Sequence, residues 1–161
     1  MKQKSSPQKV LFVCLGNICR SPSAEAVFRK KSAEENLNLI FDSAGTIGHH
    51  SGEKSDPRSI RHAADRGYEM NHSARKISLE DFEVFDLVLV MDHKNYMDVL
   101  NLCPEGRSHK VKKIREFRES HSLEIVPDPY YGSADDFELV LDLIEDSWLA
   151  FKKHYFPSAI P

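Results

Sequence analysis

The sequence predicts an α/β fold: one three-layer domain built on a four-stranded parallel sheet with helices on both faces. Short continuous apolar runs alternate with longer segments of helical periodicity. Strands covered on both faces have such continuous runs, and strand–helix alternation leads to a parallel sheet. The 161 residues contain no repeat, linker or change of composition, which suits a single domain. We expect residues 9–157 to form this domain and residues 1–8 to be a disordered lead.

The first half of the chain contains two predicted strands and two predicted helices. Residues 10–13 are a continuous apolar run, and residues 39–41 form a second run that ends at Asp42-Ser43. Between these runs, residues 22–34 predict a helix with one apolar face, formed by Ala24, Val27 and Phe28. A further helix is expected to begin near Asp56-Pro57 and to continue toward Gly67.

The second half of the chain continues the alternation. Residues 87–91 predict a third buried strand, and a helical pattern follows it, formed by Tyr96, Val99, Leu100 and Cys103. Residues 125–126, directly before Pro127, predict a short fourth strand. The last helix has the clearest amphipathic pattern, formed by Phe137, Val140, Leu141, Ile144, Trp148 and Phe151. We expect a flavodoxin-like arrangement, in which ligands bind at the carboxyl ends of the strands.

Composition and charge argue against several classes of protein. The formal net charge is −3 at pH 7, so we expect no nucleic-acid partner and no membrane partner. No apolar run has the length of a transmembrane helix, and none follows the N-terminus as in a signal peptide. Three cysteines do not make a disulfide framework and suit a reducing compartment. We therefore expect a cytoplasmic protein.

The residues with chemical potential lie between the first strand and the first helix. Cys14 is followed after five residues by Arg20, and Ser21-Pro22 suits an N-cap and a first helical position. Gly16 allows a positive φ, and Asn17 is among the few other residues that tolerate it. A loop that leads into a helix N-terminus directs several N–H groups at one point, where an anion can bind. We expect Cys14 to exist there largely as a thiolate, and Arg20 to bind two phosphate oxygens at once.

Two other interpretations of this loop are possible. Cys14 could be a buried residue at a strand end, which is the commonest place for a free cysteine. A nucleotide-binding loop is less favoured, because this loop has a single glycine and neither glycine-rich nucleotide pattern occurs in the chain. The order of Gly, Asn, Arg, Ser and Pro in the loop favours a phosphate-like ligand and a nucleophilic cysteine.

The stretch VLFVCLGNICRSPSAEAVF resembles the signature of low-molecular-weight protein tyrosine phosphatases. The resemblance covers nearly the whole chain and includes a second, distant motif, Asp128-Pro129-Tyr130-Tyr131-Gly132. It implies that Cys14 is the nucleophile, that Arg20 binds the phosphate, and that Asp128 is the general acid and base. From the local sequence alone, Asp128 would be an ordinary turn residue before proline.

The resemblance also implies roles for the surrounding residues. The substrate phosphate would contact the loop and its flanking positions, Leu15, Gly16, Asn17, Ile18, Cys19 and Ser21. A hydrogen-bond network that supports the loop would contain Asn17, Ser21, Ser43 and His72. Without the resemblance, Ser43 would be a turn residue and His72 a surface histidine. The rim would be formed by His49, Tyr130 and Tyr131. Under peroxide, Cys14 and Cys19 would form a reversible disulfide.

The expected substrate is a phosphotyrosine-containing protein or a small aryl phosphate, and no metal or other cofactor is implied. Ile18 favours an aryl phosphate, because arginine phosphatases of this superfamily have Thr at the matching position. Two alternatives are an arsenate reductase of the same fold and a phosphate-binding module without turnover. The reductase is disfavoured because it needs a relay of further cysteines, of which only Cys103 is present. The binding module is disfavoured because it would typically have lost the nucleophile or the acid. We expect a monomer or weak self-association.

Overall fold

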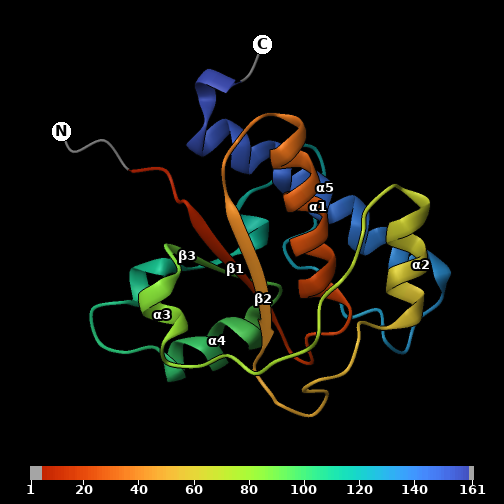
Figure 1. Ribbon diagram of the computed structural model, residues 1–161, viewed down its shortest axis with the longest axis horizontal. Helices are drawn as coiled ribbons and strands as arrows, with labels where there is room; N and C mark the ends of the chain where they lie inside the picture. Colours follow the sequence, from red (N-terminus) through yellow and green to blue (C-terminus); the bar gives the residue numbers. More distant parts are fainter. Residues whose placement is uncertain (1–4, 160–161) are drawn as a thin grey trace.

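The middle layer of the protein is a parallel sheet (Figure 1), seen in a computed structural model that describes residues 5–159. Within these residues, the sheet has four strands in the order β2-β1-β3-β4. They are β1 (Lys9–Cys14), β2 (Ile40–Gly45), β3 (Leu87–Val90) and β4 (Val111–Lys113). The register aligns Cys14 at the end of β1 with Gly45 at the end of β2. These carboxyl ends lie side by side, at the end of the sheet where such folds bind ligands.

Helices cover both faces of the sheet, as predicted (Figure 1). On one face, α1 (Arg20–Glu34) packs against α5 (Ala134–Tyr155), and α2 (Pro57–Asp65) packs beside α5. On the other face lie α3 (Asp81–Val84) and α4 (His93–Leu102). Short 3₁₀ turns connect or follow these elements at Ser108–Lys110, Ile114–Glu116 and Pro157–Ala159. The prediction of a three-layer α/β fold is confirmed.

The packing of α1 against the sheet fixes where the loop before it lies. Successive side chains of β1 point to opposite faces, so Phe12 joins the core under α1 and α5 while Leu11 joins the core under α3 and α4. The ring of Phe28 makes edge-to-face contacts with four other rings, those of Phe12 (4.8 Å between centroids), Trp148 (5.2 Å), Phe151 (5.3 Å) and Phe41 (6.0 Å). These contacts hold the buried face of α1 on β1 and α5.

The predicted fourth strand at residues 125–126 is wrong. The fourth strand is β4, whose pattern is weak in the sequence because two of its three residues are half-buried lysines. Since β4 lies at the edge of the sheet, it needs only β3 as a partner. Residues 125–126 instead cross the end of β3, where the Val126 N–H donates to the Met91 carbonyl (2.8 Å). Pro127 follows and has no N–H with which to continue a ladder.

The first helix begins one residue before the position that was predicted as its N-cap. Its first residue is Arg20 and its N-cap is Cys19, so the prediction that Ser21 is the N-cap is wrong. The reason is that the Ser21 hydroxyl lies beside the sulfur of Cys14 (3.0 Å) and not beside the free N–H groups of the helix. Pro22 still lies within the first turn, where its missing N–H costs no hydrogen bond.

The predicted lead at residues 1–8 falls partly outside the described residues, which begin at Ser5. The described part has contacts with the domain. The Ser6 hydroxyl donates to the carbonyl of Tyr155 (2.8 Å), and the Gln8 N–H donates to the carboxylate of Asp86 (2.8 Å). Residues 5–8 therefore run along the end of α5 and toward the start of β3.

Candidate active site

The loop between β1 and α1 curls so that its carbonyl groups face outward. Three of them accept backbone N–H groups from the segment between β2 and α2: Cys14 from Thr46 (2.9 Å), Leu15 from Ile47 (3.2 Å) and Ile18 from Asp56 (2.8 Å). In a trans peptide, the C=O of one residue points opposite to the N–H of the next. Several loop N–H groups therefore point inward and form a nest for an anion, to which the N-terminus of α1 adds positive charge.

Asn17 is the centre of the network that holds this loop. Its backbone has the left-handed conformation, with φ 57°, and the residue is 1% exposed. The Nδ2 atom donates to the hydroxyls of Ser21 (2.8 Å) and Ser43 (3.0 Å). The Oδ1 atom accepts from His72 Nε2 (2.7 Å) and from the Arg75 N–H (3.0 Å). All four hydrogen-bonding positions of the amide are used, and the four predicted supporting residues lie together.

Glycines at two positions allow close approach to the loop. Of the two loop residues that the sequence allows to have a positive φ, Gly16 and Asn17, Asn17 has this conformation and Gly16 does not. A Cβ at Gly16 would lie 3.1 Å from the ring of His50, which rests against the loop. A Cβ at Gly45 would lie 2.7 Å from the Leu15 carbonyl oxygen. Gly16 and Gly45 therefore provide space for the loop and its neighbours.

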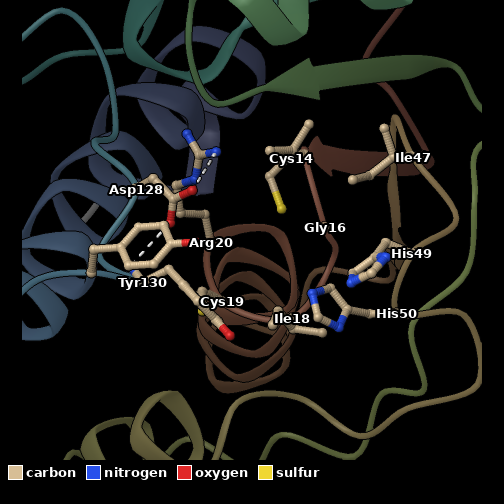
Figure 2. Close-up of a pocket in the computed structure, with 12 residues that line it drawn as sticks. Cys14, Gly16, Ile18, Cys19, Arg20, Ile47, His49, His50, Asp128 and Tyr130 are labelled. Atoms are coloured by element: carbon tan, nitrogen blue, oxygen red, sulfur yellow. Dashed lines mark hydrogen bonds and ion pairs between the residues drawn. The ribbon is translucent and has the colours of Figure 1, made fainter.

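The sulfur of Cys14 lies at the centre of the nest. It accepts the Asn17 N–H (3.3 Å) and lies 3.0 Å from the Ser21 hydroxyl oxygen. That oxygen accepts the amide of Asn17, and its hydroxyl hydrogen can point to the sulfur at 3.0 Å or to the Ala44 carbonyl at 3.5 Å. Figure 2 shows the sulfur pointing into the space between Arg20 and Asp128 on one side and Ile47 on the other.

Arg20 is buried beside this sulfur, with a side chain that is 3% exposed. Its Nη1 donates to Asp92 (2.6 Å) and to the Val126 carbonyl (3.0 Å), and its Nη2 lies 3.8 Å from Asp128. Burial tends to lower the pKa of Arg20, but Cys14 and the two carboxylates outweigh it and raise the pKa above its usual range. Arg20 therefore brings a permanent positive charge to the pocket.

Asp92 is a functional residue that the sequence analysis missed. Its second oxygen accepts the Asn95 N–H (2.8 Å) and so caps the N-terminus of α4. One carboxylate thus fixes both the start of a helix and the orientation of the Arg20 guanidinium. The sequence signal that could have found Asp92 is its position directly after the third apolar run, because ligands bind at the carboxyl ends of such strands.

Asp128 reaches the pocket from the irregular segment before α5. The segment is held by Val126, whose N–H donates to Met91 and whose carbonyl accepts from Arg20. The Asp128 side chain is 46% exposed, and its Oδ1 accepts the N–H of Tyr130 (3.1 Å). The carboxyl group therefore lies beside Arg20 at the mouth of the pocket (Figure 2).

The pocket brings together most of the residues predicted for substrate contact. Those that line it are Cys14, Leu15, Gly16, Ile18, Cys19, Arg20, Ile47, His49, His50, Asp128, Tyr130 and Tyr131. Asn17 and Ser21 lie behind this surface, where they support it. Tyr131 is 96% exposed, so the aromatic wall beside Asp128 is mainly Tyr130. Ile47 and His50 line the opposite rim with His49.

Comparisons with known proteins agree with this geometry. The family "Low molecular weight phosphotyrosine protein phosphatase" matches residues 9–155. The chain belongs to this family, whose members are phosphoric monoester hydrolases. A putative low molecular weight protein-tyrosine-phosphatase of Synechocystis is 45% identical over 142 residues, which cover 86% of this chain and 90% of that protein.

Solved structures with the same fold include phosphatases of more than one kind. A protein tyrosine phosphatase from Entamoeba histolytica with Hepes in the active site is 41% identical, has a TM-score of 0.87, and is matched over 91% of this chain and 96% of that one. A Drosophila arginine phosphatase is 31% identical with the same TM-score of 0.87, over 92% and 98% of the two chains. The low-molecular-weight phosphatase fold thus occurs with two named substrate classes.

Behind the loop of this phosphatase lies a charged cluster that the sequence analysis did not predict. His72 Nδ1 lies 3.2 Å from Glu25 and 3.6 Å from Asp42. The ligand atoms of these three residues lie within 4.8 Å of one another, which is close enough for a metal ion. However, Arg29 and Arg75 bind the two carboxylates at 2.8 and 3.0 Å. The cluster is already neutralised by cations, and it holds the His72 ring in place.

Cys19 lies in the pocket wall and, like Cys14, is not in a disulfide. Burial, with smaller contributions from Asp56 and Cys14, raises the pKa of Cys19 to about 12, although a hydrogen bond with Ser59 opposes the rise. Cys19 therefore remains protonated near neutral pH. It differs in this respect from a nucleophile, which must be a thiolate.

Proposed function

We propose that this phosphatase hydrolyses aryl phosphate monoesters, including phosphotyrosine in proteins, through a cysteinyl-phosphate intermediate. The observation that carries the proposal is the presence of the Cys14 sulfur, the Arg20 guanidinium and the Asp128 carboxyl in one pocket. The inward N–H groups and Arg20 suit the three outer oxygens of a phosphoryl group, where negative charge develops during its transfer.

In the first step, the Cys14 thiolate attacks phosphorus, and the bond from phosphorus to the phenolic oxygen breaks. The electron pair goes to that oxygen, which takes a proton from Asp128. The products of this step are a phenol and phosphorylated Cys14. Arg20 is held by Asp92 throughout, so its position requires no reorganisation during the reaction.

In the second step, water attacks the phosphorus of the intermediate. The Asp128 carboxylate accepts a proton from the water, and the sulfur leaves as a thiolate that the Ser21 hydroxyl stabilises at 3.0 Å. Inorganic phosphate then departs. Since Cys14 must be ionised and Asp128 protonated at the start, we expect kcat/KM to fall on both sides of a mildly acidic optimum.

The pocket walls support a flat, apolar leaving group. Tyr130 lies on one side of the mouth, and Ile47 and His49 lie on the other. Ile18 in the loop offers no hydroxyl to a guanidinium group, which supports an aryl phosphate over phosphoarginine. An arsenate reductase would need a further thiol beside Cys14 and Cys19, whereas Cys103 follows α4 and packs on the other face of the sheet.

The sequence also predicts properties of the protein outside the pocket. No helix in the described part of the chain is long and apolar enough to cross a membrane. A cytoplasmic location, a monomeric or weakly associating state and the absence of a nucleic-acid partner stay predictions. We also propose the Cys14–Cys19 disulfide: peroxide oxidises Cys14 to a sulfenic acid, and the Cys19 sulfur displaces its oxygen as water.

The test of the proposed function is steady-state hydrolysis of phenyl phosphate and p-nitrophenyl phosphate without added metal. Cys14→Ser is expected to abolish turnover of both. Asp128→Asn is expected to lower kcat/KM about a hundredfold for phenyl phosphate and much less for p-nitrophenyl phosphate, whose leaving group needs no proton. Asp135→Asn, which alters an exposed carboxylate in the first turn of α5, is the matched control. Turnover by Cys14→Ser would exclude the intermediate, and an equal loss for both esters would exclude Asp128 as the acid.

A further inference from the structure

Arg58 does not line the pocket, yet it contacts a residue that does. Its guanidinium carbon lies 5.4 Å from the centroid of the Tyr130 ring and 4.7 Å from that of Phe137. We propose that Arg58 is a positioning residue for the Tyr130 wall, and through it a determinant of the preference for aryl phosphates. The inference rests on the proposed function, because it assigns Tyr130 to the binding of the aryl group.

Arg58 is itself held rigidly at the start of α2. Its Nε and Nη2 atoms donate to the two oxygens of Asp56 at 3.1 and 2.8 Å, and its backbone N–H donates to the same carboxylate at 2.8 Å. A bidentate pair fixes the plane of a guanidinium as well as its distance. The hydrogen bond from Arg58 is the main cause that lowers the pKa of Asp56, so this carboxylate stays ionised at the pH of the reaction.

The two rings beside Arg58 differ in how firmly they are held. Phe137 is buried, and its ring also stacks on that of His62 with 5.7 Å between centroids and 10° between planes. Tyr130 is exposed, and its other aromatic neighbour is Tyr131 at 4.9 Å, which is almost entirely in solvent. The orientation of Tyr130 thus depends on the cation beside it more than on core packing.

Two consequences distinguish this role from general support of the fold. The N–H of Tyr130 donates to Asp128, so a displaced Tyr130 affects the aryl side of the pocket and the acid. The phosphate loop is held by the Asn17 side chain and by backbone hydrogen bonds, one of them from the Asp56 N–H to the Ile18 carbonyl. That backbone bond does not use the Asp56 carboxylate, which is the group that binds Arg58. Loss of the Arg58 side chain should therefore weaken the binding of an aryl group and leave the binding of free phosphate unchanged.

The experiment compares phenylphosphonate with inorganic phosphate, each bound to the whole protein and measured by calorimetry. Arg58→Met keeps the length of the side chain without its charge and its fork. We expect the dissociation constant of phenylphosphonate to rise about three- to tenfold, and that of phosphate to stay within about twofold. In a Tyr130→Leu background, Arg58→Met should have no further effect on phenylphosphonate.

Controls make each outcome decisive. Arg66→Met removes another arginine of the α2 region, one that pairs with carboxylates of α5, and should change neither dissociation constant. Arg58→Gln also removes the charge and keeps a polar side chain, and it carries the same test if Arg58→Met does not fold. Equal weakening of both ligands, no weakening, or a full effect in the Tyr130→Leu background would each overturn the inference. Failure of the proposed function would appear separately, as turnover by Cys14→Ser.

Discussion

Substitutions of Asn17 separate the two ways in which this residue shapes the phosphate loop. Asn17→Gly removes the four hydrogen bonds of the amide and keeps a residue that adopts φ 57° without strain. Asn17→Ala removes the same bonds and forces a side chain into the left-handed region. The difference between the two variants therefore measures the conformational contribution alone.

The magnitudes follow from the contacts. Each of the four hydrogen bonds contributes about 1 kcal/mol, and the groups that lose a partner are buried or half-buried. We expect Asn17→Gly to lower the free energy of unfolding by about 3 to 4 kcal/mol. Asn17→Ala should lower it by about 1 to 2 kcal/mol more, because of the steric cost of the left-handed conformation.

Urea denaturation at pH 7 measures the free energy of unfolding, and the rate of p-nitrophenyl phosphate hydrolysis reports whether the loop keeps its active conformation. With the inward N–H groups no longer held, we expect kcat/KM to fall at least about a hundredfold in both variants. Asn36 provides the matched control, because it is exposed and has φ 58° but lies after α1, far from the pocket in sequence. Asn36→Gly and Asn36→Ala should differ by a similar steric cost and retain full activity.

Two results would refute this reasoning. A loss of less than about 1 kcal/mol in Asn17→Gly would mean that the amide network contributes little to the fold. Activity within a few-fold of wild type in either variant would mean that the loop keeps its shape without the network.

The remaining predictions concern the pH dependence of stability and the room for side chains beside the loop. Burial alone would raise the pKa of Asp146, but hydrogen bonds from residues 119–120 and from Arg115 outweigh it and lower the pKa to about 2. The ionised carboxylate therefore stabilises the fold by about 2 kcal/mol above pH 4, and this contribution is lost as the pH falls toward 2. Thermal unfolding as a function of pH should show the loss. The Asp146→Asn variant should lack this pH dependence. Gly45→Ala should lower kcat/KM and the free energy of unfolding, because the added methyl would lie 2.7 Å from a loop carbonyl oxygen. Gly16→Ala should have a milder effect, because the atom nearest to its added methyl belongs to a side chain that can move. Equal effects at the two glycines would contradict the packing argument.

The arrangement of Cys14 and Arg20 could be predicted because both lie in one short stretch of the sequence. Cys14 and Arg20 are joined by one short loop that begins at a buried strand and ends in a helix. Local geometry alone brings such neighbours together, so their joint position needed no knowledge of the rest of the fold. The backbone conformation of the same loop could not be predicted in detail. The sequence allowed a positive φ at Gly16 or Asn17, and the hydrogen bonds of Asn17 with other elements place it at Asn17.

The sequence by itself determined the alternation of strands and helices and the place of the loop that contains Cys14 and Arg20, and a resemblance predicted that Asp128 is the acid. Only the tertiary structure decided the edge strand β4, the carboxylate of Asp92 that orients Arg20, and the position of Arg58 behind Tyr130. The physical reason is that periodicity and turn chemistry act over a few residues, whereas these three features depend on contacts between distant segments. An edge strand of lysines and an ordinary helix-capping aspartate have no local signal of the partners that the folded chain gives them.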